Sequence, residues 1–142
     1  MKKHSLSVSL LPVILLLCMV MLTGCKNNDT APLWNSAAYT EDKELGTGVN
    51  TAVVEVEVQD KKVLFTVHTD ADTVGAALIE NGLISGEQGA YGLYVKTVNG
   101  ILADYDQDQS YWAFYIGDDL AASGVDLTEI TEGAVYRLVY TK

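Results

Sequence analysis

The sequence predicts a small α+β domain with a β-grasp-like arrangement, in which a mostly antiparallel sheet packs on one short helix. Apolar and polar residues alternate over 53–58 and again over 63–68, which is the pattern of half-buried strands. One stretch with helical spacing follows at about 73–81, and further strand patterns lie between 93 and 140. A hairpin, then a helix, then more strands fits a sheet wrapped around one helix better than a sandwich.

The first half of the domain is expected to be a hairpin followed by the helix. Polar residues at 59–62 form the turn between the first two strands. Asp70 or Asp72 is expected to cap the helix, because a short acidic side chain accepts the free amide protons of the first turn. Asn81-Gly82 is the expected end of the helix, since both residues tolerate the left-handed conformation. Gly75 costs about 1 kcal/mol relative to alanine in a helix, so we expect the helix to approach the sheet closely there.

The second half of the domain is expected to consist of strands and turns. Residues 85–92 contain three glycines and predict a flexible loop before a strand at 93–98. Asn99-Gly100 predicts a two-residue hairpin turn, because a type I′ turn needs positive φ at both central positions. Two more strands are expected, at 111–116 and at 134–140.

The start of the chain predicts a lipoprotein signal peptide at residues 1–24. Basic residues open it, and the apolar run at 10–22 is shorter than the roughly 18 to 20 residues that cross a bilayer. An N-terminal anchor helix is the alternative. Leu22-Thr23-Gly24-Cys25 resembles the lipobox of bacterial lipoproteins, in which the signal is cut before the cysteine and its thiol is acylated. The resemblance implies a fatty-acylated (palmitate-type) Cys25 that anchors the protein to the cell membrane, outside the cytoplasm.

A lipidated flexible tether is expected at residues 25–51, because this stretch is rich in Asn, Asp, Ala, Thr and Gly. Trp34 and Tyr39 are its aromatic residues, and they either dock on the domain or stay exposed. Residues 52–142 remain for the folded domain.

Charge and composition restrict the function. Without residues 1–24 the chain has 7 basic and 19 acidic residues, a formal net charge of −12. That field repels nucleic acid and favours metal cations or cationic and neutral ligands, although it also serves simply to keep an exported protein soluble. With Cys18 in the signal and Cys25 acylated, no cysteine nucleophile remains. One histidine, His68, is left, and no serine lies in a nucleophile-elbow context. We therefore expect a protein that is not an enzyme.

Several segments of the domain resemble the DUF4430 family. They are residues 92–100 and 111–115, followed by Gly124-Val125 and residues 132–136. The resemblance covers roughly residues 53–142. It implies a fold like the small C-terminal domain of transcobalamin and intrinsic factor, which closes over cobalamin together with a helical barrel. The resemblance also implies that the bacterial relatives of this chain are surface lipoproteins, and that a corrinoid is one candidate ligand.

Aromatic residues around the predicted strand at 111–116 are the candidate ligand contacts. Alternation places Tyr111 and Tyr115 on one face, and the more apolar face with Phe114 is expected to cover the core. Flat amphipathic rings suit a planar ligand or a partner protein, because they bury a large area at low entropic cost. The candidate ligand-binding residues are Tyr91, Tyr94, Tyr111, Trp112 and Tyr115. An equally open interpretation places Trp112 in the core and leaves the tyrosines half-buried.

Three aspartates form the rival candidate, a metal site. Asp104, Asp106 and Asp108 occupy the first, third and fifth places of a D-x-D-x-D run with Ser110 at the seventh, as in calcium loops. Tyr115 stands where an EF-hand has its bidentate glutamate, so the run is not an EF-hand. An acidic surface turn without an ion is the alternative.

These observations predict a membrane-anchored extracytoplasmic lipoprotein with a small ligand- or partner-binding module. Its expected partners are the membrane, through Cys25, and a small molecule such as a corrinoid, or a surface protein; nucleic acid is excluded. A calcium-binding structural or adhesion domain is the alternative function.

Overall fold

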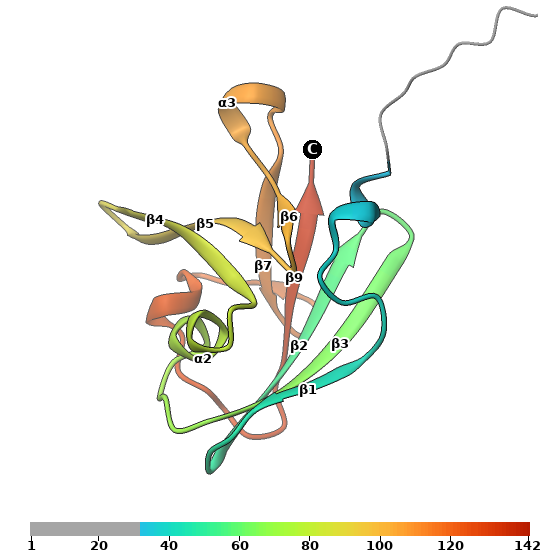
Figure 1. The fold of residues 1–142 in the computed structure, drawn as a ribbon. Helices are drawn as coiled ribbons and strands as arrows, with labels where there is room; N and C mark the ends of the chain where they lie inside the picture. The colour runs from blue at the N-terminus through green and yellow to red at the C-terminus, as the bar shows by residue number, and fades with distance from the viewer. Residues whose placement is uncertain (1–31) are drawn as a thin grey trace, which may run out of the picture. The chain divides into compact units, whose positions relative to one another are not determined.

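The computed structural model describes residues 32–142, which form an α+β domain with two sheets (Figure 1). The larger sheet is mixed, with strand order β1-β3-β2-β9-β7-β8. Its strands are β1 (Lys43–Gly46), β2 (Asn50–Val58), β3 (Lys61–Thr69), β7 (Tyr111–Ile116), β8 (Asp119–Leu120) and β9 (Val135–Thr141). The smaller, antiparallel sheet contains β4 (Ile84–Gly89), β5 (Gly92–Val98) and β6 (Ile101–Leu102). The helices are α2 (Val74–Glu80) and α3 (Tyr105–Asp108), with short 3₁₀ helices η2 (Leu33–Ser36) and η3 (Val125–Leu127).

The predicted α+β fold is confirmed, and the pairing of its strands explains the β-grasp likeness. β2 and β3 form the expected antiparallel hairpin, and β2 also pairs in parallel with the last strand, β9. The larger sheet is therefore mixed, with three antiparallel and two parallel strand pairings. Its inward side chains meet across the strands, with Val54 opposite both Phe65 on β3 and Tyr136 on β9, and all three are buried.

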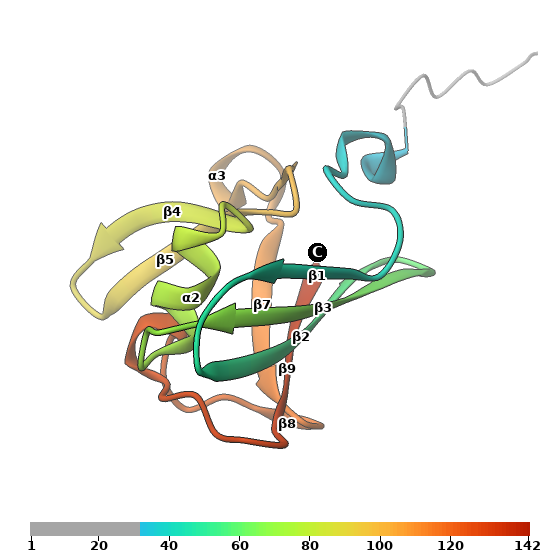
Figure 2. The same ribbon diagram turned by 60° about the horizontal axis from the view of Figure 1, so that its bottom comes forward.

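Helix α2 lies between the two sheets and contacts both β3 and β4 (Figure 2). Thr73 caps it by accepting the amide proton of Ala76 at 3.3 Å, so the prediction of Asp70 or Asp72 as the cap is wrong. A threonine hydroxyl serves the same purpose as a carboxylate at this position. Gly75 does mark a close approach, but to the backbone of η3 and not to the sheet: a Cβ on it would lie 2.7 Å from the Cα of Asp126.

The second half of the domain contains elements that the sequence did not predict, which are β4, α3, β8 and η3. Residues expected to form a flexible loop are strand β4, which pairs with β5 to make a hairpin. The acidic run after β6 contains the single turn of helix α3. The predicted hairpin at Asn99-Gly100 is confirmed: both residues have positive φ, at 49° and 79°, and β5 pairs with β6 on either side of them.

The expected tether at 25–51 extends too far into the domain. Within its described part, from residue 32 onward, η2 and β1 are folded, β1 pairs with β3, and β2 begins at Asn50. Trp34 and Tyr39 pack against the core, and the Tyr39 ring meets Phe65 edge-on at 5.7 Å. The predicted signal peptide at 1–24 and the acylated Cys25 lie outside the described residues. No helix within residues 32–142 is long and apolar enough to cross a membrane.

Candidate functional site

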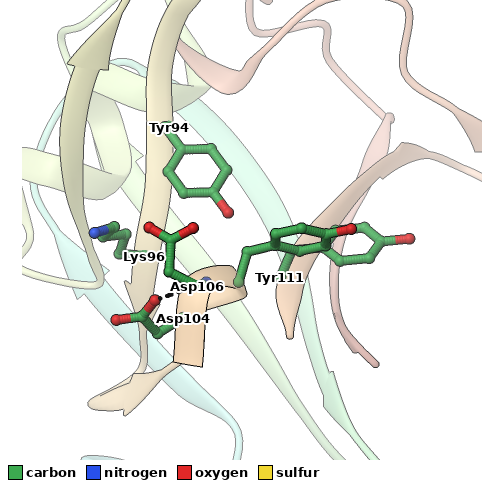
Figure 3. Close-up of a pocket in the computed structure, with 6 residues that line it drawn as sticks. Tyr94, Lys96, Asp104, Asp106 and Tyr111 are labelled. Atoms are coloured by element: carbon green, nitrogen blue, oxygen red, sulfur yellow. Dashed lines mark hydrogen bonds between the residues drawn. The ribbon is translucent and has the colours of Figure 1, made fainter. Parts of the chain in front are cut away.

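A pocket of about 490 Å³ opens between β5, α3 and β7 (Figure 3). We call it the tyrosine pocket, because three tyrosines dominate its lining. Its residues are Tyr94, Lys96, Asp104, Tyr105, Asp106 and Tyr111. The exposed fraction is 43% for Tyr94, 56% for Tyr105 and 39% for Tyr111. These are large fractions for aromatic residues next to a packed core.

Strand β5 forms one wall of the pocket and contributes Tyr94 and Lys96 to it. These residues are two positions apart, so alternation along the strand places their side chains on the same face. The backbone carbonyl of Lys96 fixes this wall to the other two. It accepts hydrogen bonds from the Ala103 amide, at 2.8 Å, and from the Trp112 indole N–H, at 3.2 Å. Because Ala103 precedes α3 and Trp112 follows Tyr111, one acceptor holds the three elements of the pocket together.

The wall formed by α3 is held by a network of hydrogen bonds around its short turn. Asp104 caps the helix, accepting the Asp106 amide at 3.1 Å and the Gln107 side-chain amide at 3.0 Å. Buried Ser110 accepts the Asp104 amide at 3.0 Å, and its own hydroxyl and amide donate to Asp108. The side-chain and backbone hydrogen bonds from Ser110 lower the pKa of Asp108, and Lys142 adds to this. These contacts fix the turn that presents Tyr105 and Asp106.

The charged side chains around the pocket differ in whether they are paired. Lys96 Nζ lies 3.1 Å from Glu87 Oε1 on β4, and the hydrogen bond from this carboxylate raises the pKa of Lys96. Both carboxylate oxygens of Asp104 are used in capping α3. Among residues 32–142, the carboxylate of Asp106 has no hydrogen bond or salt bridge, although its negative charge contributes to the raised pKa of Lys96. In the view of Figure 3 this carboxylate lies beside the ring of Tyr94.

The structure divides the five predicted ligand-binding residues into two groups. Tyr94 and Tyr111 line the pocket together. Tyr91 lies at the tip of the β4–β5 hairpin, 96% exposed, and Tyr115 lies under the guanidinium of Arg137, 5.4 Å from ring centroid to Cζ. Trp112 is only 7% exposed, and its indole edge meets the ring of Tyr140 at 5.5 Å, as the core interpretation predicts.

The three predicted metal ligands do not converge. Asp104 and Asp106 line the pocket, whereas Asp108 turns to Ser110 and to Lys142 Nζ, 3.2 Å away. In the part of the chain that the structure describes, no group of three acidic, histidine or cysteine side chains is placed to hold a metal ion. The run folds as a helical turn whose carboxylates cap backbone amides, and this differs from a calcium loop, where the oxygens face one cation.

Sequence reasoning did not identify Tyr105 and Lys96 as pocket residues. A signal for Lys96 was present, because it lies two residues from Tyr94 on a predicted strand and so shares its face. Tyr105 had no comparable signal. Its position depends on the single turn of α3, which is shorter than any segment that helical periodicity can reveal.

Comparisons with known proteins identify relatives of the folded domain. The sequence profile of the family described as "Domain of unknown function (DUF4430)" matches residues 71–141. One similar crystal structure is that of a protein from Ruminococcus gnavus ATCC 29149, which is named as a proposed metal binding protein. The two sequences are 29% identical and the TM-score is 0.62. The match covers 66% of this chain and 98% of that one. No curated protein matches at a significant level.

The crystal structure of haptocorrin in complex with Cbi is also similar, with a TM-score of 0.51 and 16% identity. The match covers 68% of this chain and 27% of haptocorrin, so the chain spans about a quarter of that protein's length. At this level of identity the likeness shows a shared fold.

Proposed function

The chain belongs to the DUF4430 family, and we propose that it is a lipid-anchored extracytoplasmic protein whose tyrosine pocket binds a small organic molecule. The observation that carries the proposal is the gathering of three exposed tyrosine rings around one pocket of about 490 Å³. That volume lies within the range of about 300 to 1,000 Å³ in which small-molecule sites fall. We propose that the role of this lining is to bind a ligand.

The rigidity of the pocket walls supports binding as well. Association costs free energy when side chains and loops must become ordered. Here the Lys96 carbonyl connects β5 to the segments on either side of α3, and Ser110 fixes the turn of α3. Tyrosine rings have few rotatable bonds and present a large amphipathic surface, so little freedom is lost when a ligand covers them.

A corrinoid is a candidate ligand. The support is the common fold with haptocorrin, whose structure contains Cbi (cobinamide), together with rings that suit a flat ligand. We expect cobinamide to bind the purified domain in isothermal titration calorimetry. Tyr111→Ala should weaken the binding by about tenfold, because truncating a central aromatic contact costs at least about 1 to 2 kcal/mol.

A matched control is provided by Tyr91→Ala, which removes a tyrosine that is 96% exposed and outside the pocket. This variant should bind as tightly as the wild type. Equal loss of binding in both variants, or unchanged binding in Tyr111→Ala, would place the ligand elsewhere on the molecule.

Metal binding is the second candidate function, with calcium as the ion and a structural or adhesive role for the domain. Its support is the likeness to the Ruminococcus gnavus protein and the D-x-D-x-D run. The test is thermal unfolding in calcium chloride and in EDTA. A midpoint raised by calcium in the wild type but not in Asp106→Ala would favour this function, and equal midpoints in both solutions would reject it.

The proposed anchor is Cys25, on the strength of the Leu22-Thr23-Gly24-Cys25 motif. Two or more acyl chains hold a protein stably on a membrane, whereas one gives weak, reversible binding. Cells fed a labelled fatty acid should incorporate the label into the wild-type protein and not into Cys25→Ala. Label retained by the variant would refute the anchoring site.

A further inference from the structure

We propose that the tyrosine pocket selects an organic ammonium cation, with a quaternary or alkylated ammonium group as the part that is recognised. The inference rests on the proposed function, since it names the class of ligand for that pocket. It follows from three features of the site: the rings, the carboxylate of Asp106 and the net negative charge.

The rings that line the pocket come from three different elements of the fold. Tyr94 belongs to β5, Tyr105 to α3 and Tyr111 to β7, and all three are partly open to solvent. The face of an aromatic ring carries negative electrostatic potential and attracts cations. Sites that recognise quaternary ammonium groups commonly surround them with several such rings.

Asp106 gives the pocket its charge. Among the pocket residues within 32–142, it has the carboxylate without a hydrogen bond or salt bridge, and in the view of Figure 3 it lies beside the Tyr94 ring. Asp104 adds a second negative charge, although both of its oxygens accept hydrogen bonds from α3. Lys96 is the positive charge of the lining, and its ammonium group is paired with Glu87.

The pairing of Lys96 matters because it balances one cation with an acid outside the pocket lining. Lys96 is paired with Glu87, and Asp104 and Asp106 also lie close enough to act on its charge. One positive and three negative side chains therefore leave the site with a net negative charge. The chain as a whole has a formal net charge of −10, which adds an attractive field for cations. An anionic ligand would therefore meet repulsion both locally and from the whole protein.

The same lining suits a bulky organic cation better than a metal ion. Calcium requires about six to eight oxygen ligands that converge on it. Of the two pocket aspartates, Asp104 already caps a helix, and ring faces do not replace carboxylate ligands. An alkylated ammonium is weakly hydrated and apolar at its surface, so it can lie against rings while its charge faces Asp106.

The test compares choline with 3,3-dimethyl-1-butanol, which has the same shape but no charge. Binding is followed by calorimetry and by the NMR signals of the pocket tyrosines in the folded domain. We expect choline to bind roughly tenfold more tightly than the neutral compound. A tenfold preference corresponds to about 1.4 kcal/mol, which the attraction of the cation to the rings and the carboxylate can supply. Asp106→Asn should remove most of this preference, and Asp60→Asn, an exposed change in the β2–β3 turn, should leave it intact.

The outcomes separate the two proposals. Equal binding of choline and the neutral compound at the pocket overturns the cation inference while the pocket remains a ligand site. A choline preference that survives Asp106→Asn overturns the role of that carboxylate. If choline, the neutral compound and cobinamide all leave the tyrosine signals unchanged, the proposed function itself fails.

Discussion

Removal of the Asn99 side chain should destabilise the domain strongly, although this residue lies in a two-residue turn. Its side chain is 1% exposed and forms a pair of hydrogen bonds with the backbone of Tyr39. Nδ2 donates to the Tyr39 carbonyl at 2.8 Å, and Oδ1 accepts the Tyr39 amide at 2.9 Å. The Asn99 carbonyl also accepts the Ala38 amide at 2.8 Å. Asn99 therefore fastens residues 32–42 to the β5–β6 turn.

The magnitude follows from the two partners that Asn99→Ala leaves unpaired. Each partly buried backbone group without a hydrogen bond costs about 1 to 3 kcal/mol. Alanine at positive φ adds about 1 kcal/mol, because its Cβ crowds the backbone in the left-handed region where asparagine is tolerated. We expect the free energy of unfolding to fall by about 3 to 7 kcal/mol, a large part of the 5 to 15 kcal/mol typical of a domain.

The assay is urea unfolding combined with amide hydrogen exchange. In Asn99→Ala, the Tyr39 and Ala38 amides should lose protection first, because their anchor is weakened. The matched control is Gln59→Ala in the β2–β3 turn, where φ is 56° and the side chain is exposed. That change should cost no more than about 1 kcal/mol. An Asn99→Ala domain as stable as the control, with the Tyr39 amide still protected, would refute the reasoning.

Two other predictions concern an ion-pair network and a glycine. Partial burial raises the pKa of Glu57, but hydrogen bonds from Arg137 and Lys62 outweigh this effect and lower it below 4.5. The ionised Glu57 carboxylate therefore stabilises the domain at neutral pH, and this stabilisation is lost as the pH falls below about 4.5. The difference in unfolding free energy between wild type and Glu57→Gln should shrink over that range. A difference that grows on acidification would contradict this. Gly75→Ala should cost up to about 3 kcal/mol, and more than Gly82→Ala, because its Cβ would meet the backbone of η3. Gly82→Ala, with nothing within 4 Å, should cost about 1 kcal/mol through its positive φ alone; equal losses in the two variants would contradict the steric argument.

The elements that could be predicted from the sequence are those with a local pattern. Alternation over residues 53–58 fixes which side chains face the core, and Asn99-Gly100 fixes a turn through its backbone preference. The β4 strand could not be predicted in this way, because its glycines resemble a loop and it is a strand only through pairing with β5. The same holds for the segment at 32–46, whose polar composition resembles a linker until Asn99 and β3 bind it.

The candidate site was predicted in part for a related reason. The sequence predicts Tyr94 and Tyr111 as candidate ligand contacts on strands, and the pocket contains both. Residue type alone does not distinguish Trp112, a core residue, from the pocket tyrosines. Alternation places it on the opposite face from Tyr111, where it meets Tyr140 in the core. Tyr105 and Asp106 form one wall only because Asp104 and Ser110 fold the acidic run into a turn, a three-dimensional property that residue spacing does not encode.

The central claim is that the tyrosine pocket is the ligand site, and ring-labelled tyrosine NMR tests it most directly. Cobinamide and choline are titrated separately into the folded domain, and the signal of each tyrosine is assigned by single substitution to phenylalanine. We predict that at least one of these ligands shifts the ring signals of Tyr94, Tyr105 and Tyr111 and leaves those of Tyr91 and Tyr115 unchanged. Shifts confined to Tyr91 or Tyr115, or no shift with either ligand, would contradict the claim.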